Sequence, residues 1–109
     1  MMDTKNIVIY VHGKGGSAEE AEHYKPMFPE SKIIGFDYRA QTPWEAKEEF
    51  AHFFAEKRRR CDRLTLIANS IGAFFSMMSL DTVLVDRAYL ISPVVDMEKL
   101  MENMMLWAN

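Results

Sequence analysis

Ser70 lies where an apolar run changes into an apolar segment with helical spacing. The residues from Leu64 to Ala68 are typical of a buried strand, and apolar residues recur every three or four positions after the serine. Ala68 and Gly72, two positions before and two after Ser70, are both small. A strand that turns sharply into a helix needs small residues there, because larger side chains would collide where the two elements meet. A serine in such a bend has a strained backbone and carries its hydroxyl over a helix N-terminus, where it can act as a nucleophile.

The five residues from Ala68 to Gly72 therefore resemble the nucleophile elbow, G-x-S-x-G, with alanine in place of the first glycine. A plainer interpretation stands beside this one. A serine that follows a strand often caps the next helix through its hydroxyl, and Ser70 before Ile71 fits that role as well. The motif alone does not decide whether Ser70 is a nucleophile or a helix cap. The other motifs of the chain are needed for that.

A glycine-rich loop follows the first apolar run, residues 6–11, which is typical of a parallel strand covered on both faces. Glycines in such a loop allow positive φ and a close approach of the backbone to a ligand. The loop consists of His12, Gly13, Lys14, Gly15 and Gly16.

Strands and helices alternate along the whole chain. Further strands are expected at 32–36, from residue 64 to Ser70, and at 87–91. Capping boxes at 17–20 and 42–45 predict helices that start near residues 18 and 43, the first ending before Pro29. A third helix follows Ser70 and a last one begins near Asp96. Phe50, Phe53 and Phe54 should face the core from the second helix, and Ile71, Phe74, Phe75 and Met78 from the third, with Met77 and Leu80 beside them.

This alternation predicts an α/β fold, a three-layer sandwich with a four-stranded parallel sheet. In such sheets the site lies beyond the carboxyl ends of the strands, beside the switch in strand order. The loop at 12–16 and Ser70 both follow carboxyl ends. If the first and third strands are neighbours, the two motifs meet, which favours the nucleophile over the cap.

Together the two motifs resemble the α/β-hydrolase superfamily, and the order of elements fits a partial form of that fold over nearly the whole chain. The resemblance implies that Ser70 is the nucleophile of acyl transfer. It also implies an oxyanion hole formed by the backbone N–H groups of Ile71 and of the glycine loop, with Lys14 as the donor. His12, Gly13, Gly15 and Gly16 would complete the site loop. Each such donor contributes about 3 kcal/mol to lowering the barrier.

The sequence departs from the family in one respect: no histidine follows Ser70. The three histidines, at 12, 23 and 52, all precede it, and hydrogen bonding within the loop or exposure on a helix is the simpler interpretation of each. Asp96 is a candidate acid, and it reads equally well as the N-cap of the last helix. We therefore expect the 109 residues to be the N-terminal part of a longer serine hydrolase, nearly inactive on esters by itself.

The composition of the chain excludes some classes of binding partner. A net charge of -3 and a pI near 5.6 argue against nucleic acid or an anionic membrane. No signal or membrane-spanning segment is recognisable, which indicates a cytoplasmic protein. Cys61 is the one cysteine, and no His/Cys cluster has metal-ligand spacing, so neither metal nor cofactor is expected. We expect self-association through the edge strand at 87–91, the methionine-rich terminal helix, or both.

Three functions remain open from the sequence. The first is a serine hydrolase acting on an ester, thioester or amide of a small molecule. The second is a binding module of the same fold without catalysis. The third is a nucleotide-binding domain with the phosphate at residues 13–17, although that loop matches neither common phosphate-binding motif.

Overall fold

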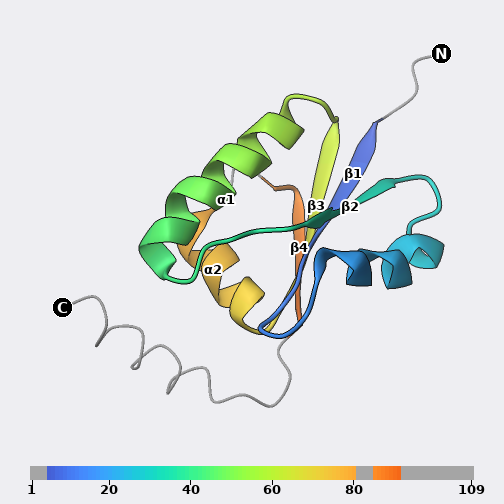
Figure 1. Cartoon of the computed structure of the whole chain (residues 1–109). Helices are drawn as coiled ribbons and strands as arrows, with labels where there is room; N and C mark the ends of the chain where they lie inside the picture. The colour runs from blue at the N-terminus through green and yellow to red at the C-terminus, as the bar shows by residue number, and fades with distance from the viewer. Residues whose placement is uncertain (1–4, 81–84, 92–109) are drawn as a thin grey trace.

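Four parallel strands form the centre of the computed structural model, which describes residues 5–80 and 85–91 (Figure 1). Three helices connect the strands, so that strand and helix alternate as the sequence predicted. In chain order the elements are β1 (Asn6–Val11), η1 (Ala18–Met27), β2 (Lys32–Phe36), α1 (Pro43–Arg58), β3 (Arg63–Asn69), α2 (Ile71–Ser79) and β4 (Arg87–Ile91).

The strand order in the sheet is β2-β1-β3-β4. Ile9 of β1 pairs with Ile34 on one side and with Leu66 on the other. The chain thus moves from β1 to one side, and then crosses to the opposite side for β3 and β4. The switch in strand order lies between β1 and β3, where sheets of this kind place their sites.

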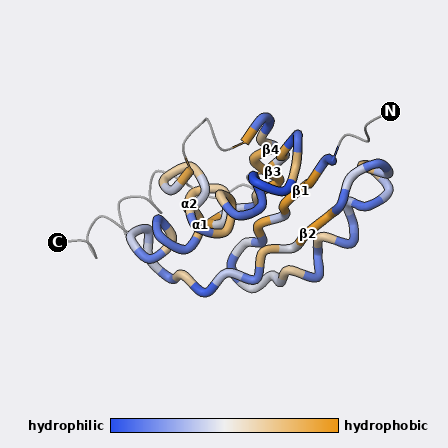
Figure 2. The backbone as a smooth tube through the Cα atoms, turned by 90° about the horizontal axis from the view of Figure 1, so that it is seen from above, coloured by the Kyte–Doolittle hydropathy of each residue, from blue (hydrophilic) through white to orange (hydrophobic). Residues whose placement is uncertain are grey.

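Helices cover the sheet on both sides, which confirms the three-layer α/β architecture. One apolar cluster joins one face of the sheet to α1 and α2, and it includes Val11, Phe50 and Phe75. A second cluster joins the other face to η1 through Tyr10 and Ala21. β1 is buried on both faces, and the hydrophobic colour runs along it between the layers (Figure 2). This explains why its sequence is apolar without alternation.

The two expected capping boxes have different outcomes. At the start of α1, the Thr42 Oγ accepts a hydrogen bond from the Glu45 N–H at 3.3 Å, as predicted. At the start of η1, Ser17 makes no side-chain capping bond, so that prediction is wrong. The Glu20 carboxylate instead accepts a hydrogen bond from the Tyr10 hydroxyl at 2.7 Å. The Glu20 side chain, which a capping box would use at the helix start, is thus bonded to Tyr10 of β1. The segment is a 3-10 helix.

The predicted inward face of α2 is wrong at its end. Met77 and Met78 are 62% and 53% exposed. Phe74 and Phe75 are buried, as predicted. The buried face also includes Gly72 and Ser76, and the Ser76 hydroxyl donates to the Gly72 carbonyl at 2.8 Å. Apolar residues of α2 lie on nearly all sides of the helix, so their spacing did not define which side packs inward.

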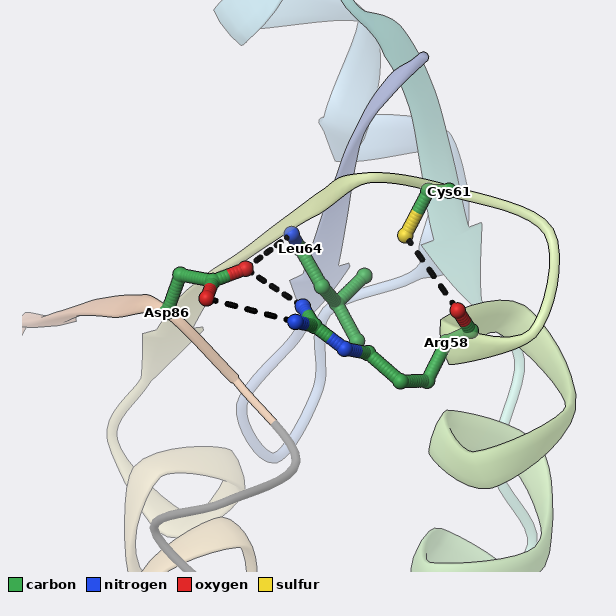
Figure 3. Close-up of polar contacts among 4 residues, drawn as sticks. All are labelled: Arg58, Cys61, Leu64 and Asp86. Atoms are coloured by element: carbon green, nitrogen blue, oxygen red, sulfur yellow. Dashed lines mark hydrogen bonds and ion pairs between the residues drawn. The ribbon is translucent and has the colours of Figure 1, made fainter. Parts of the chain in front are cut away.

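Asp86 ties the start of β4 to two other elements (Figure 3). Its carboxylate accepts hydrogen bonds from the Leu64 N–H of β3, at 2.8 Å, and from the Arg58 guanidinium at the end of α1. These two donors hold the pKa of the Asp86 carboxyl below its usual range. Arg58 thus serves as an ion-pair partner that joins the end of α1 to the start of β4.

β4 is an edge of the sheet, as predicted. All five of its residues are exposed, and Tyr89, Leu90 and Ile91 stand out as large apolar side chains. Self-association through this strand stays a prediction. The terminal helix expected from Asp96 lies outside the described residues. Among the described helices, none has the length and apolar character needed to cross a bilayer.

Candidate active site

Ser70 has a backbone conformation that few residues other than glycine adopt. Its φ is 55° and its ψ is -122°. Among the described residues, Ser70 is the single residue other than glycine that has a positive φ. Helix N-caps lie in the extended region and accept a hydrogen bond through the side chain. Ser70 makes no side-chain capping bond. The cap interpretation is therefore wrong, and the residue lies in a strained bend between β3 and α2.

Hydrogen bonds on both sides of the residue fix this bend. The Ser70 N–H donates to the Ile91 carbonyl of β4 at 2.9 Å. The Ser70 carbonyl accepts from the N–H groups of Ala73, at 3.0 Å, and Phe74, at 3.3 Å, in the first turn of α2. The strand and the helix thus hold the peptide groups of Ser70 in place, which is how a fold maintains a strained residue.

The loop after β1 packs directly against the bend. A Cβ atom on Gly13 would lie 2.9 Å from the Cβ of Ser70, and one on Gly72 would lie 2.4 Å from the His12 carbonyl oxygen. Both contacts are too short for any side chain. Glycine at 13 and at 72 therefore permits the two motifs to meet. β1 and β3 are neighbours in the sheet, which was the condition for the two motifs to meet, and the loop and Ser70 lie together at the switch point.

His12 and Tyr38 fix the shape of the loop. The His12 Nδ1 lies 2.8 Å from the Gly13 carbonyl oxygen, and the Tyr38 hydroxyl donates to the His12 carbonyl at 2.8 Å. Their rings stack with centroids 4.5 Å apart. Burial and the nearby Glu49 carboxylate raise the pKa of Tyr38 to about 12, so its hydroxyl remains a donor at neutral pH. His12 thus has the loop-shaping contacts that the sequence favoured for it.

A hollow of about 560 Å3 opens beside the bend. Gly13, which packs against Ser70, and Ile71, which follows it in the sequence, both line the hollow. Ser70 and Gly16 do not line it. The size falls in the range of small-molecule sites. The lining residues are His12, Gly13, Lys14, Gly15, Tyr38, Arg39, Ala40, Gln41, Ile71 and Phe75.

Two backbone N–H groups at this hollow are available as donors. The Ile71 N–H opens α2, and the first N–H groups of a helix have no partner within it. The Lys14 N–H belongs to the loop that contacts the bend. Among the described residues, neither group donates to a backbone carbonyl. These are the two groups that the resemblance to the α/β-hydrolases implies as oxyanion donors, and that role stays a prediction.

The described residues place no general base next to the serine. His23 and His52 are exposed on η1 and α1, and His12 is engaged with its own loop. Asp96, the candidate acid, lies outside the described residues. Within residues 5–80 and 85–91, no group of three His, Cys, Asp or Glu side chains is arranged to hold a metal ion.

Two features of the site had only a weak signal in the sequence. Tyr38 and Arg39 follow β2 and line the hollow, and the hydrogen bond from Tyr38 to the loop has no signal in the local sequence. Phe75 was expected in the core, and it also lines the hollow. Its position four residues after Ile71 places both on one side of α2, which is the signal that could have found it.

Comparison of the chain with models of known protein families and with curated protein sequences finds no significant match to either.

Proposed function

We propose that Ser70 is the nucleophile of an acyl-transfer reaction, the hydrolysis of an ester, thioester or amide of a small molecule, in a domain of the α/β-hydrolase type. The observation that carries this proposal is the conformation of Ser70, with φ 55° and ψ -122° and no capping bond. Such a backbone costs about 1–3 kcal/mol and is concentrated at functional sites. A serine with a merely structural role in the first turn of α2 has no need of it.

The mechanism follows from the neighbours of the bend. The Ser70 Oγ attacks the carbonyl carbon of the substrate and loses its proton to a base, forming a tetrahedral intermediate. The N–H groups of Ile71 and Lys14 donate to its oxyanion. Collapse of the intermediate expels the protonated leaving group and leaves an acyl-serine, which water then hydrolyses. A positioned base adds about a hundred- to ten-thousand-fold to such a reaction. Without one, the oxyanion donors support only slow turnover.

A fluorophosphonate probe tests the nucleophile apart from turnover. We expect slow formation of a covalent adduct on Ser70, located by peptide mass spectrometry, and faster formation when imidazole or higher pH supplies the missing base. Ser70→Ala should remove the adduct, and Ser17→Ala, a change of an exposed serine near the loop, should leave it. Circular dichroism confirms that each variant is folded. No adduct on Ser70 in the presence of imidazole, in a folded protein, would exclude this function.

A binding module without catalysis is the second candidate. It is favoured by one observation, that none of the histidines in the described residues is hydrogen-bonded to Ser70. In that case ligands would bind the hollow reversibly and Ser70 would resist the probe at every imidazole concentration. The same labelling experiment therefore separates the two candidates.

A further inference from the structure

The hollow beside Ser70 combines an apolar wall with a positive rim. Phe75, Ile71 and Tyr38 supply apolar surface from α2 and from the segment after β2. Lys14 and Arg39 also line it, and both are exposed. Among residues 5–80 and 85–91, none that lines the hollow carries a carboxylate, although the protein as a whole has a net charge of -3. The sign of the charge at the hollow is therefore opposite to that of the whole molecule.

The two cations are not neutralised by side-chain pairs in the part of the chain that the structure describes. Its four ion pairs involve other cations, namely Lys25, Lys57, Arg58 and Arg60. The nearby carboxylate, Glu49, is directed at the main chain. Its oxygens accept from the Arg39 N–H, at 2.9 and 3.1 Å, and from the Ala40 N–H, at 2.8 Å. Within the described residues, no carboxylate is therefore paired with the guanidinium of Arg39 or the ammonium of Lys14.

The backbone that carries these cations is held in place. Glu49 fixes the main chain at residues 39 and 40, and the Tyr38 hydroxyl joins the same segment to the His12 carbonyl. Lys14 belongs to the loop that contacts Ser70 through Gly13. The main chain at both residues therefore has a defined position, and both side chains line the hollow beside the bend.

We infer that the site takes a small ester or thioester that carries an anionic group, a carboxylate or a phosphate, a few bonds from its reacting carbonyl. This inference rests on the proposed function and adds the substrate class. Arg39 and Lys14 bind the anion, and Phe75, Ile71 and Tyr38 contact the short apolar part between anion and carbonyl. Locally focused positive charge also attracts an anionic substrate that the rest of the protein repels.

Equilibrium binding tests the substrate class without requiring catalysis. Monomethyl succinate, an ester with one carboxylate, is titrated into the 15N-labelled protein, and amide shifts of Gly13 and Gly15 report on the hollow. Dimethyl succinate is the neutral comparison. Inorganic phosphate, added as a competitor, distinguishes a phosphate-binding rim from one that prefers carboxylate, and either preference supports an anionic substrate. The same titrations are made on Ser70→Ala, which lacks the nucleophile and retains both cations.

We expect monomethyl succinate to bind more tightly than dimethyl succinate, to both the wild type and Ser70→Ala. Arg39→Gln and Lys14→Gln should each weaken its binding about two- to five-fold, the effect of an exposed ion pair, and added salt should reduce the preference. Lys47→Gln and Arg59→Gln remove exposed cations that do not line the hollow and should change nothing.

Equal binding of the two esters, or equal loss in the hollow and control variants, would overturn the inference. Because binding to Ser70→Ala is measured directly, this failure is distinct from a failure of the labelling experiment, which would remove the nucleophile and leave the anion site in place.

Discussion

Replacement of Ser70 by glycine should make the protein more stable. The strained backbone at φ 55° and ψ -122° costs about 1–3 kcal/mol for any residue with a Cβ, and glycine adopts it without that cost. Glycine also gains about 0.4–1 kcal/mol of conformational freedom in the unfolded chain, which offsets part of the benefit. The net increase in the free energy of unfolding should be about 1 kcal/mol, or about 4 °C in Tm for a domain of this size.

Ser70→Ala provides the comparison, because it removes the hydroxyl and keeps the strain. Since the hydroxyl makes no capping bond, we expect the unfolding free energy of Ser70→Ala to equal that of the wild type. Ala73→Gly is the matched control. It places glycine in the first turn of the same helix at ordinary helical angles, where it should destabilise by about 1 kcal/mol. Urea unfolding followed by circular dichroism measures all three variants.

The opposite order of stabilities would refute the reasoning. A serine that caps α2 would lose about 1 kcal/mol on replacement by alanine and a few tenths on replacement by glycine, so both variants would be less stable than the wild type. That result would show an unstrained serine with a structural role, and the proposed nucleophile would lose its principal support.

Further predictions concern packing and pH. Gly72→Ala should destabilise by about 1–3 kcal/mol in urea unfolding, because its Cβ would lie 2.4 Å from the His12 carbonyl oxygen; unchanged stability would contradict this close approach. The pKa of Asp86 is lowered in the folded protein, so its contribution to stability is complete above the unfolded pKa and is lost as the pH falls through the folded value. Asp86→Asn should therefore unfold more easily at pH 7 and show less additional loss in acid than the wild type. The pKa values of Tyr10 and Tyr38 are raised to about 12, so their contribution is complete below pH 10 and is lost as the pH rises from 10 towards 12. Ultraviolet titration should show two late phenolate signals that Tyr10→Phe and Tyr38→Phe remove one by one, and early titration of both would contradict their burial.

Local sequence patterns determined most of the elements. β1, β2 and β4 have the bounds that were predicted, because each is a short apolar run between turn or charged residues. The start of α1 follows from its capping box, whose partners lie within three residues of each other. The helix η1 begins at Ala18 and ends before Pro29, as predicted. Its predicted capping bond is absent, and Glu20 bonds instead to Tyr10 on β1. Predictions from local pattern succeed where the deciding contacts are themselves local.

For the site, the sequence by itself determined the two motifs, the small residues at 13, 68 and 72, and the carboxyl ends on which they lie. Only the tertiary structure decided that β1 and β3 are neighbours, which brings Gly13 against Ser70. It also decided the conformation of Ser70, because bonds from β4 and from α2 fix a backbone that the residue would not adopt alone. The positive rim was decided in the same way. Lys14 and Arg39 are 25 positions apart in the sequence, and the parallel pairing of β1 with β2 is what places both at one edge of the sheet.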